Sequence, residues 1–166
     1  PALREKYTKS GYWVNIRLIR YSDVVLMAAE AACELGDNTS ARRYLEMVRA
    51  RARGTNANIL PEVTTDNQSE LREAIRHERR VELAYEDFRF FDIRRWRIAE
   101  DVCNEYIQGY DVTKGKDGGF YTIVNVGDRM VFEKKHYLFP LATAEILMNP
   151  ALEQNPGWPK LSTATN

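Results

Sequence analysis

The stretch that most constrains the fold is HERRVELAYEDFRFFDIRRW, residues 77–96, which combines acidic, basic and aromatic residues. In a helix over residues 68–85, at about 100° per residue, Glu78 and Glu82 fall in the middle of an apolar stripe. The other members of that stripe are Leu71, Ala74, Ile75 and Tyr85. A carboxylate taken from water costs several kcal/mol unless it is paired and hydrogen-bonded. The sequence therefore predicts that each glutamate has a cationic partner or a raised pKa.

Two interpretations of these glutamates are open. Glycoside hydrolysis uses two carboxyl groups on either side of a sugar bond, but residues one turn apart on a helix point in almost the same direction. A structural ion-pair network is the alternative, because guanidinium groups pair well with buried carboxylates. Seven arginines lie in residues 76–97: Arg76, Arg79, Arg80, Arg89, Arg94, Arg95 and Arg97. We expect Glu78 and Glu82 to pair with Arg94 or Arg95, or with Arg20.

Helical periodicity precedes this stretch. Residues 22–35 have apolar side chains at helical spacing, Ser22 or Asp23 is available as an N-cap, and Gly36 follows. Residues 40–53 repeat the pattern and end at Gly54. The connection is short, so the two helices are expected to form an antiparallel hairpin. The residues that share one face are Val25, Ala28, Ala29, Ala32 and Cys33 on the first helix, and Ala41, Tyr44, Leu45, Val48 and Ala52 on the second.

The remaining pattern predicts further helices and one small β element. Asn67 is placed to cap the helix over 68–85, with Glu70 completing a capping box. A fourth helix is predicted over residues 90–104. A polar loop over 104–119, a β-hairpin over 120–139 that turns at Gly127 and Asp128, and a short helix over 143–148 follow. The fold class is mainly α, with helical hairpins and a small β-hairpin near the C-terminus.

Composition limits the classes of function. A chain of 166 residues that is 44% hydrophobic suits one domain over residues 1–166. Lysine plus arginine and aspartate plus glutamate both number 24, so no basic field favours nucleic acid. His77 and His136 are isolated and no ligand cluster has metal spacing, so we expect no metal or other cofactor. Cys33 is expected to be a buried thiol, while a disulfide with Cys103 stays open. No segment approaches the roughly 18 apolar residues of a membrane helix.

Aromatic residues on the predicted loops are the candidates for ligand contacts. A tyrosine ring has apolar faces and a polar hydroxyl, so it can stack on a sugar, although packing in a core or turn is the alternative for each residue. The candidates for carbohydrate binding are Tyr106, Tyr110, Phe120 and Tyr121.

Four blocks, taken together and in this order, resemble one family. They are IRLIRYSDVVLMAAEAACELG (16–36), ARRYLEMVRARARG (41–54), LREAIRHERRVELAYEDFRFFDIRRW (71–96) and HYLFPLATAEILMNPALEQNPGW (136–158). They look like the C-terminal part of the SusD/RagB family of outer-membrane nutrient-binding lipoproteins. Members of that family are much longer, so the resemblance implies that this chain is a C-terminal portion of such a protein.

The resemblance implies tetratricopeptide-like helical hairpins and a non-catalytic role in binding glycans or other nutrients. It also implies a cell-surface lipoprotein of the outer membrane of Bacteroidetes-type bacteria, which contacts the membrane only through a lipid anchor in a preceding N-terminal part. A TonB-dependent transporter would be the protein partner. No family motif assigns ligand-binding residues to this sequence. Two other functions are carried as alternatives: a helical-repeat module that binds only a protein, and a glycoside hydrolase that uses Glu78 and Glu82.

Overall fold

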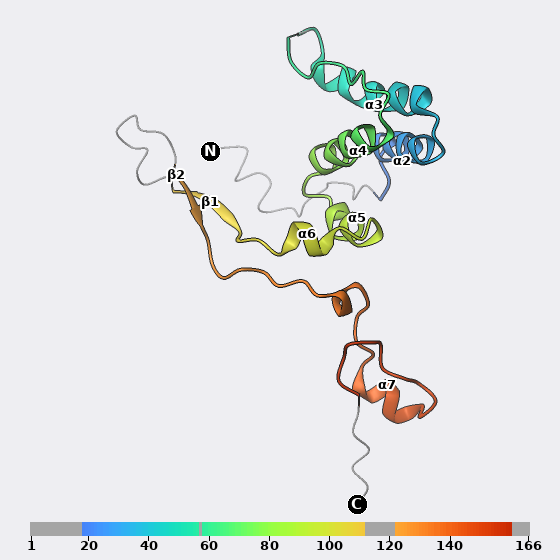
Figure 1. Cartoon of the computed structure of the whole chain (residues 1–166), viewed down its shortest axis with the longest axis vertical. Helices are drawn as coiled ribbons and strands as arrows, with labels where there is room; N and C mark the ends of the chain where they lie inside the picture. Colours follow the sequence, from blue (N-terminus) through green and yellow to red (C-terminus); the bar gives the residue numbers. More distant parts are fainter. Residues whose placement is uncertain (1–17, 57, 112–121, 161–166) are drawn as a thin grey trace, which may run out of the picture. The chain divides into compact units, whose positions relative to one another are not determined.

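A computed structural model describes residues 18–56, 58–111 and 122–160. The fold is mainly α-helical with one two-stranded antiparallel sheet, as the sequence predicts (Figure 1). The chain forms two compact units, one ending at Phe88 and the other beginning at Arg89. Each unit is described by itself below, and the prediction of one domain over the whole chain stays a prediction.

The first unit contains the predicted helical hairpin. Helix α2 (Tyr21–Glu34) is followed after three residues by α3 (Asn38–Arg53), which packs back along it (Figure 1). Gly36 has φ +79°, and the amides of Gly36 and Asp37 donate to the carbonyls of Cys33 and Ala32. This is the Schellman pattern, in which a left-handed residue ends a helix. The Asp37 carboxylate caps α3 by accepting from the Ser40 amide at 3.0 Å.

The expected cap of the first helix is different in the structure. Arg20 occupies the N-cap position of α2, and no side chain caps that end. Ser22 and Asp23 lie inside the first turn instead, and both are buried. The prediction that one of them caps the helix is therefore wrong, because Asp23 is used in a contact between helices.

Helix α4 (Gln68–Glu82) is the third helix in the described part of this unit. The predicted cap is confirmed, since the Asn67 side chain accepts from the amides of Ser69 and Glu70. The capping box is not: the Glu70 carboxylate accepts from the Thr65 hydroxyl, and the Asn67 amide donates to that same hydroxyl. A threonine before the helix therefore takes the position expected for Glu70.

The end of α4 comes earlier than predicted. The helix stops at Glu82, and Tyr85 adopts φ +64° and is fully exposed. A left-handed residue cannot continue a right-handed helix. The expectation that Tyr85 shares the apolar stripe is therefore wrong, whereas Leu71, Ile75 and Glu78 are buried as expected.

The core of the first unit lies between α2, α3 and α4. Small residues on the facing sides of α2 and α3, among them Ala29 and Ala41, are completely buried and allow the helices to approach closely. Cys33 is a buried free thiol, and burial, followed by the charge of Glu34, raises its pKa. The buried members of this core are Val25, Leu26, Ala29, Ala32, Cys33, Ala41, Leu45, Val48, Leu71 and Ile75.

The second unit begins with two short helices where one long helix was predicted. Helix α5 (Phe88–Arg95), which starts at the boundary, and α6 (Ala99–Cys103) are separated by a break at Arg97, which has φ +58°. The Ile98 amide donates to the Ile93 carbonyl and the Arg97 amide to the Arg94 carbonyl. This is a second Schellman ending, with arginine in the position that glycine usually occupies.

The sheet differs in its pairing from the predicted hairpin. Strand β2 (Thr122–Asn125) pairs with β1 (Gln108–Asp111), which precedes it in a segment expected to be a loop. Residues 129–139, which follow the predicted turn, form no strand. The Asn104 side chain explains this, because it accepts from the Phe132 amide at 2.6 Å and donates to the Phe132 carbonyl at 3.0 Å. The backbone polar groups of Phe132 are thereby committed to Asn104.

The end of the second unit is folded back by a similar contact. A 3-10 helix, η2 (Lys134–Tyr137), precedes α7 (Thr143–Met148), whose bounds match the prediction. The Gln154 side chain accepts from the Leu141 amide at 2.8 Å and donates to the Leu141 carbonyl at 3.0 Å. The small core of this unit consists of Ile93, Ala99 and Phe132, against which Ile98, Cys103 and Tyr137 pack.

Candidate functional site

The two glutamates singled out in the sequence lie on α4, on its side toward α2 and α3. The Glu78 side chain is buried, and that of Glu82 is 10% exposed. A charge so far removed from water needs compensation by ion pairs and hydrogen bonds. The structure provides both, and the partners come from α2 and α3.

Glu78 is paired with Arg49, an arginine on α3. Nη1 of Arg49 donates to Oε2 of Glu78 at 2.8 Å, and its other terminal nitrogen donates to the Pro61 carbonyl at 2.9 Å. The Arg49 side chain is itself only 12% exposed. This guanidinium therefore links α3, α4 and the segment between them.

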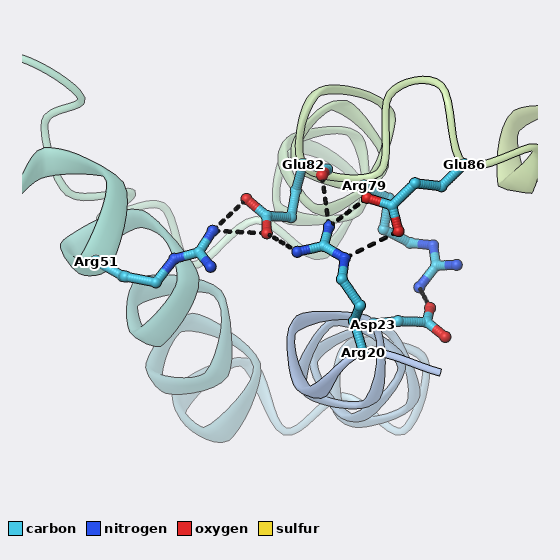
Figure 2. Close-up of polar contacts among 6 residues, drawn as sticks. All are labelled: Arg20, Asp23, Arg51, Arg79, Glu82 and Glu86. Atoms are coloured by element: carbon cyan, nitrogen blue, oxygen red, sulfur yellow. Dashed lines mark hydrogen bonds and ion pairs between the residues drawn. The ribbon is translucent and has the colours of Figure 1, made fainter. Parts of the chain in front are cut away.

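Glu82 is the centre of a larger cluster (Figure 2). Nη2 of Arg51 lies 2.6 and 2.7 Å from the two carboxylate oxygens of Glu82, and Nη1 of Arg20 lies 3.0 Å from one of them. Arg20 also donates to the Glu82 carbonyl at 2.7 Å and to the Glu86 carboxylate at 2.9 Å. The guanidinium of Arg20, which precedes α2, thus lies between the carboxylate of Glu82 at the end of α4 and that of Glu86 in the segment after it.

A third pair is the most deeply buried. Nη1 of Arg79 donates to Oδ1 of Asp23 at 2.9 Å, joining α4 to the first turn of α2 (Figure 2). Both side chains are buried. The sequence offered Arg79 only as one of seven arginines, and it assigned Asp23 to a cap, so this pair was missed.

The protonation states follow from these contacts. Burial raises the pKa of Glu82, but the hydrogen bonds from Arg51 and Arg20 outweigh it, and the pKa lies below its usual value. A general acid in glycoside hydrolysis needs the opposite, a carboxyl group whose pKa is raised. This arrangement keeps Glu82 ionised and holds three helices together.

The sequence named three possible partners for the glutamates: Arg20, Arg94 and Arg95. The structure shows Arg20 as a partner of Glu82, and it adds Arg49 and Arg51. Arg94 and Arg95 belong to the second unit. There Arg94 donates to the Phe90 carbonyl and lies over the Phe90 ring, and Arg95 donates to the buried carboxylate of Asp92.

The structure describes two of the four aromatic residues that are candidates for carbohydrate binding. Tyr106 and Tyr110 lie just before and within β1, and they are 52% and 69% exposed. Neither ring is buried in a core, so both present apolar surface to solvent. Phe120 and Tyr121 lie outside the described residues.

A pocket of about 600 Å³ opens beside the ion-pair cluster, between α2 and α3. Val25 and Val48 form part of its floor, and Met47 is exposed at its edge. The two guanidinium groups at its rim, those of Arg20 and Arg51, are paired with Glu82, so their charge is already compensated. The pocket is lined by Ile19, Arg20, Tyr21, Ser22, Val25, Met47, Val48 and Arg51.

The described residues contain neither a metal-ligand cluster nor a membrane-spanning helix. Within residues 18–56, 58–111 and 122–160, no group of three or more histidine, cysteine, aspartate or glutamate side chains is placed to hold a metal ion. Among the helices of those same ranges, none is both long enough and apolar enough to cross a membrane.

Comparisons with known proteins agree with this architecture. A family model described as the SusD family matches residues 3–158. A SusD-like protein of Formosa agariphila is 31% identical over 144 residues, covering 84% of this chain and 25% of the relative. Another SusD-like protein of that organism is 41% identical over 91 residues, covering 55% of this chain and 17% of the relative.

Solved structures give the same result. A SusD-like protein from Bacteroides fragilis superposes with a TM-score of 0.73 at 33% identity, covering 84% of this chain and 25% of that one. A SusD-like carbohydrate binding protein from the same organism gives 0.65 at 32% identity, covering 80% and 28%. The chain therefore spans about a quarter of the length of these relatives. Because the family model covers nearly the whole sequence, this chain belongs to the SusD family.

Proposed function

We propose that this chain is part of a non-catalytic, glycan-binding or nutrient-binding lipoprotein of the outer-membrane surface, which works with a TonB-dependent transporter. Membership in the SusD family supports binding, and one solved relative is described as a carbohydrate binding protein. The chain is about a quarter of its relatives' length, so the proposal concerns the whole protein from which it comes.

The ion pairing of the two acidic residues on α4 favours a binding function over catalysis. Glu78 and Glu82 are held by arginines from two other helices, and the pKa of Glu82 is lowered. Hydrolysis of a glycoside requires two carboxyl groups with a sugar between them, one of which keeps its proton near neutral pH. Carboxylates neutralised by guanidinium groups between packed helices favour a structural role.

The experiment is a polysaccharide screen of the full-length protein beside this 166-residue piece, by glycan array and by affinity gel electrophoresis. Retardation of the full-length protein by at least one polysaccharide, without release of reducing sugars, is the expected result. Release of reducing sugars that is abolished in a Glu82→Gln variant would contradict the non-catalytic role.

A second function is favoured by one specific observation, the apolar pocket on α2 and α3. Pockets with apolar floors on helical hairpins suit the side chains of a partner helix, so the alternative is a helical-repeat module that binds a protein and no small molecule. The polysaccharide screen separates the two, since a protein-binding module gives no retardation with any polysaccharide.

A further inference from the structure

The register of the β1–β2 ribbon sorts its side chains into two faces. Residues directly opposite each other in an antiparallel pair project to the same face, and alternate residues along a strand share it. Gln108 is opposite Asn125, and Tyr110 is opposite Ile123. These four side chains therefore project from one face, and all four residues are exposed.

The opposite face of the ribbon is more covered. It carries Gly109, Asp111 and Val124, which are half-buried, and Thr122, which is exposed. A side chain at Gly109 would lie only 2.8 Å from a methyl carbon of Val126, so Val126 fills the space that the glycine leaves. The Val126 amide donates to the Ile107 carbonyl at 2.7 Å and extends the ladder past the strands. The face of Gln108, Tyr110, Ile123 and Asn125 is thus the more exposed of the two, and it is the outward face of the ribbon.

The outward face has the chemistry of a sugar platform. The Tyr110 ring, which is 69% exposed, offers an apolar face and a hydroxyl. Ile123 lies beside it across the ladder and widens the apolar area. Gln108 and Asn125 form the next pair on this face, two residues and about 7 Å along the strand. Each amide can both donate and accept a hydrogen bond, as a sugar hydroxyl does.

The four residues carry no formal charge, and this selects among ligands. An anionic polysaccharide or a nucleic acid would need compensating arginine or lysine side chains on the face, which these four positions do not supply. A neutral sugar needs an apolar ring and hydrogen-bonding groups that are both donors and acceptors. These four uncharged side chains therefore suit an uncharged sugar better than an anionic one.

We propose that the face formed by Gln108, Tyr110, Ile123 and Asn125 is a binding site for a neutral polysaccharide, with Tyr110 stacking on a pyranose ring and the two amides binding its hydroxyls. The inference rests on the proposed glycan-binding function and gives it a location and a ligand class. Tyr106, which precedes the strand, is not part of the platform.

The test uses the full-length protein in affinity gels with neutral polysaccharides (starch, galactomannan and xyloglucan) and anionic ones (polygalacturonate and alginate). The Kd for an oligosaccharide of the neutral polysaccharide that binds is then measured by calorimetry. We expect Tyr110→Ala to weaken binding about tenfold, which corresponds to about 1.4 kcal/mol, because it removes the stacking ring. Gln108→Ala and Asn125→Ala should each weaken it about threefold to tenfold, the value of one net hydrogen bond.

Two variants serve as controls. Tyr110→Phe keeps the ring and removes only the hydroxyl, so it should bind within about threefold of the unsubstituted protein. Thr122→Ala changes an exposed side chain on the opposite face, and it should leave the Kd unchanged. Circular dichroism of each variant confirms that the helical fold is intact.

The outcomes separate this inference from the proposed function. Binding of a neutral polysaccharide that Tyr110→Ala leaves unchanged would overturn the platform while the glycan-binding function stands. Binding of anionic polysaccharides alone, or equal losses in Tyr110→Ala and Thr122→Ala, would also overturn it. If the full-length protein binds no polysaccharide at all, the platform fails together with the glycan-binding form of the proposed function.

Discussion

The two units of this chain are stabilised by different kinds of contact. In the first unit, three helices bury a continuous apolar core, and arginines pair with carboxylates between those helices. In the second unit the core is small, and two side-chain amides bind backbone groups far away in the sequence: Asn104 to Phe132 and Gln154 to Leu141.

This difference shows how irregular backbone is held without a large core. A side-chain amide has one carbonyl and one NH₂ group, so it satisfies the amide and carbonyl of a single residue as a neighbouring strand would. Helices satisfy their own backbone, so the first unit can use its polar side chains to join elements. We therefore expect loss of a buried charge to be the most damaging change in the first unit, and loss of an amide in the second.

The largest effect is expected for Arg79→Ala. Removing the guanidinium leaves the Asp23 carboxylate buried without its ion-pair partner, which should lower the free energy of unfolding by about 3–5 kcal/mol. Urea denaturation measures this. The double variant Asp23→Leu/Arg79→Leu should lose less unfolding free energy than the sum of the losses in Asp23→Leu and in Arg79→Leu. Additive losses would show that the two groups act independently.

The second effect is expected for Asn104→Ala. The amide and carbonyl of Phe132 would lose their partner, at a cost of about 1–3 kcal/mol for an unsatisfied polar group. Hydrogen exchange should accelerate at the Phe132 amide while the amides of α2 and α3 stay protected. Uniform acceleration over both units would show that the units do not differ in the way described.

The third effect is the pH dependence due to Glu82. Its pKa is lowered in the folded state, so its ionisation stabilises the fold above the ordinary glutamate pKa of about 4.5, and this contribution is lost as the pH falls through the folded-state pKa. In urea titrations from pH 7 down to about pH 3, the stability difference between the unsubstituted protein and Glu82→Gln should therefore shrink below about pH 4.5. A gap that stays constant would mean that Glu82 is not the group being titrated.

The smallest effect is expected for Arg51→Ala. The Arg51 side chain is 61% exposed although it contacts both carboxylate oxygens of Glu82. An exposed partner contributes about 0.2–1 kcal/mol, and Arg20 still compensates Glu82 in this variant. Thermal melting should show a small decrease. A loss as large as that of Arg79→Ala would mean that exposure does not rank these pairs.

Two helix ends show why part of the fold was predictable. Gly36 and Arg97 both adopt a left-handed conformation and end a helix with the same pair of hydrogen bonds. Glycine adopts that conformation without steric cost, so the end of α2 was visible in the sequence. Arginine at this position gives no such indication, and the break between α5 and α6 was missed. Packing of Ile93 and Ala99 in the small core accompanies that break.

The sites were predictable in kind but not in pairing. The position of Glu78 and Glu82 on an apolar stripe required partners, and arginine was the correct type. Many arginines satisfied that requirement. Which arginine pairs with which glutamate depends on how α3 packs against α4, and the sequence pattern does not give that packing. The ribbon was missed for a related reason, because alternation over the four residues of β1 is too short to separate a strand from a loop.

The amide contacts of the second unit also expose it to slow chemical ageing. Deamidation of Asn104 would replace the NH₂ group, which donates to the Phe132 carbonyl, with a negatively charged oxygen facing that carbonyl. The exchange alters one atom and almost no volume, yet it turns an attraction into a repulsion. A sample in which Asn104 has deamidated would lose this contact in the second unit, with its helical content almost unaltered.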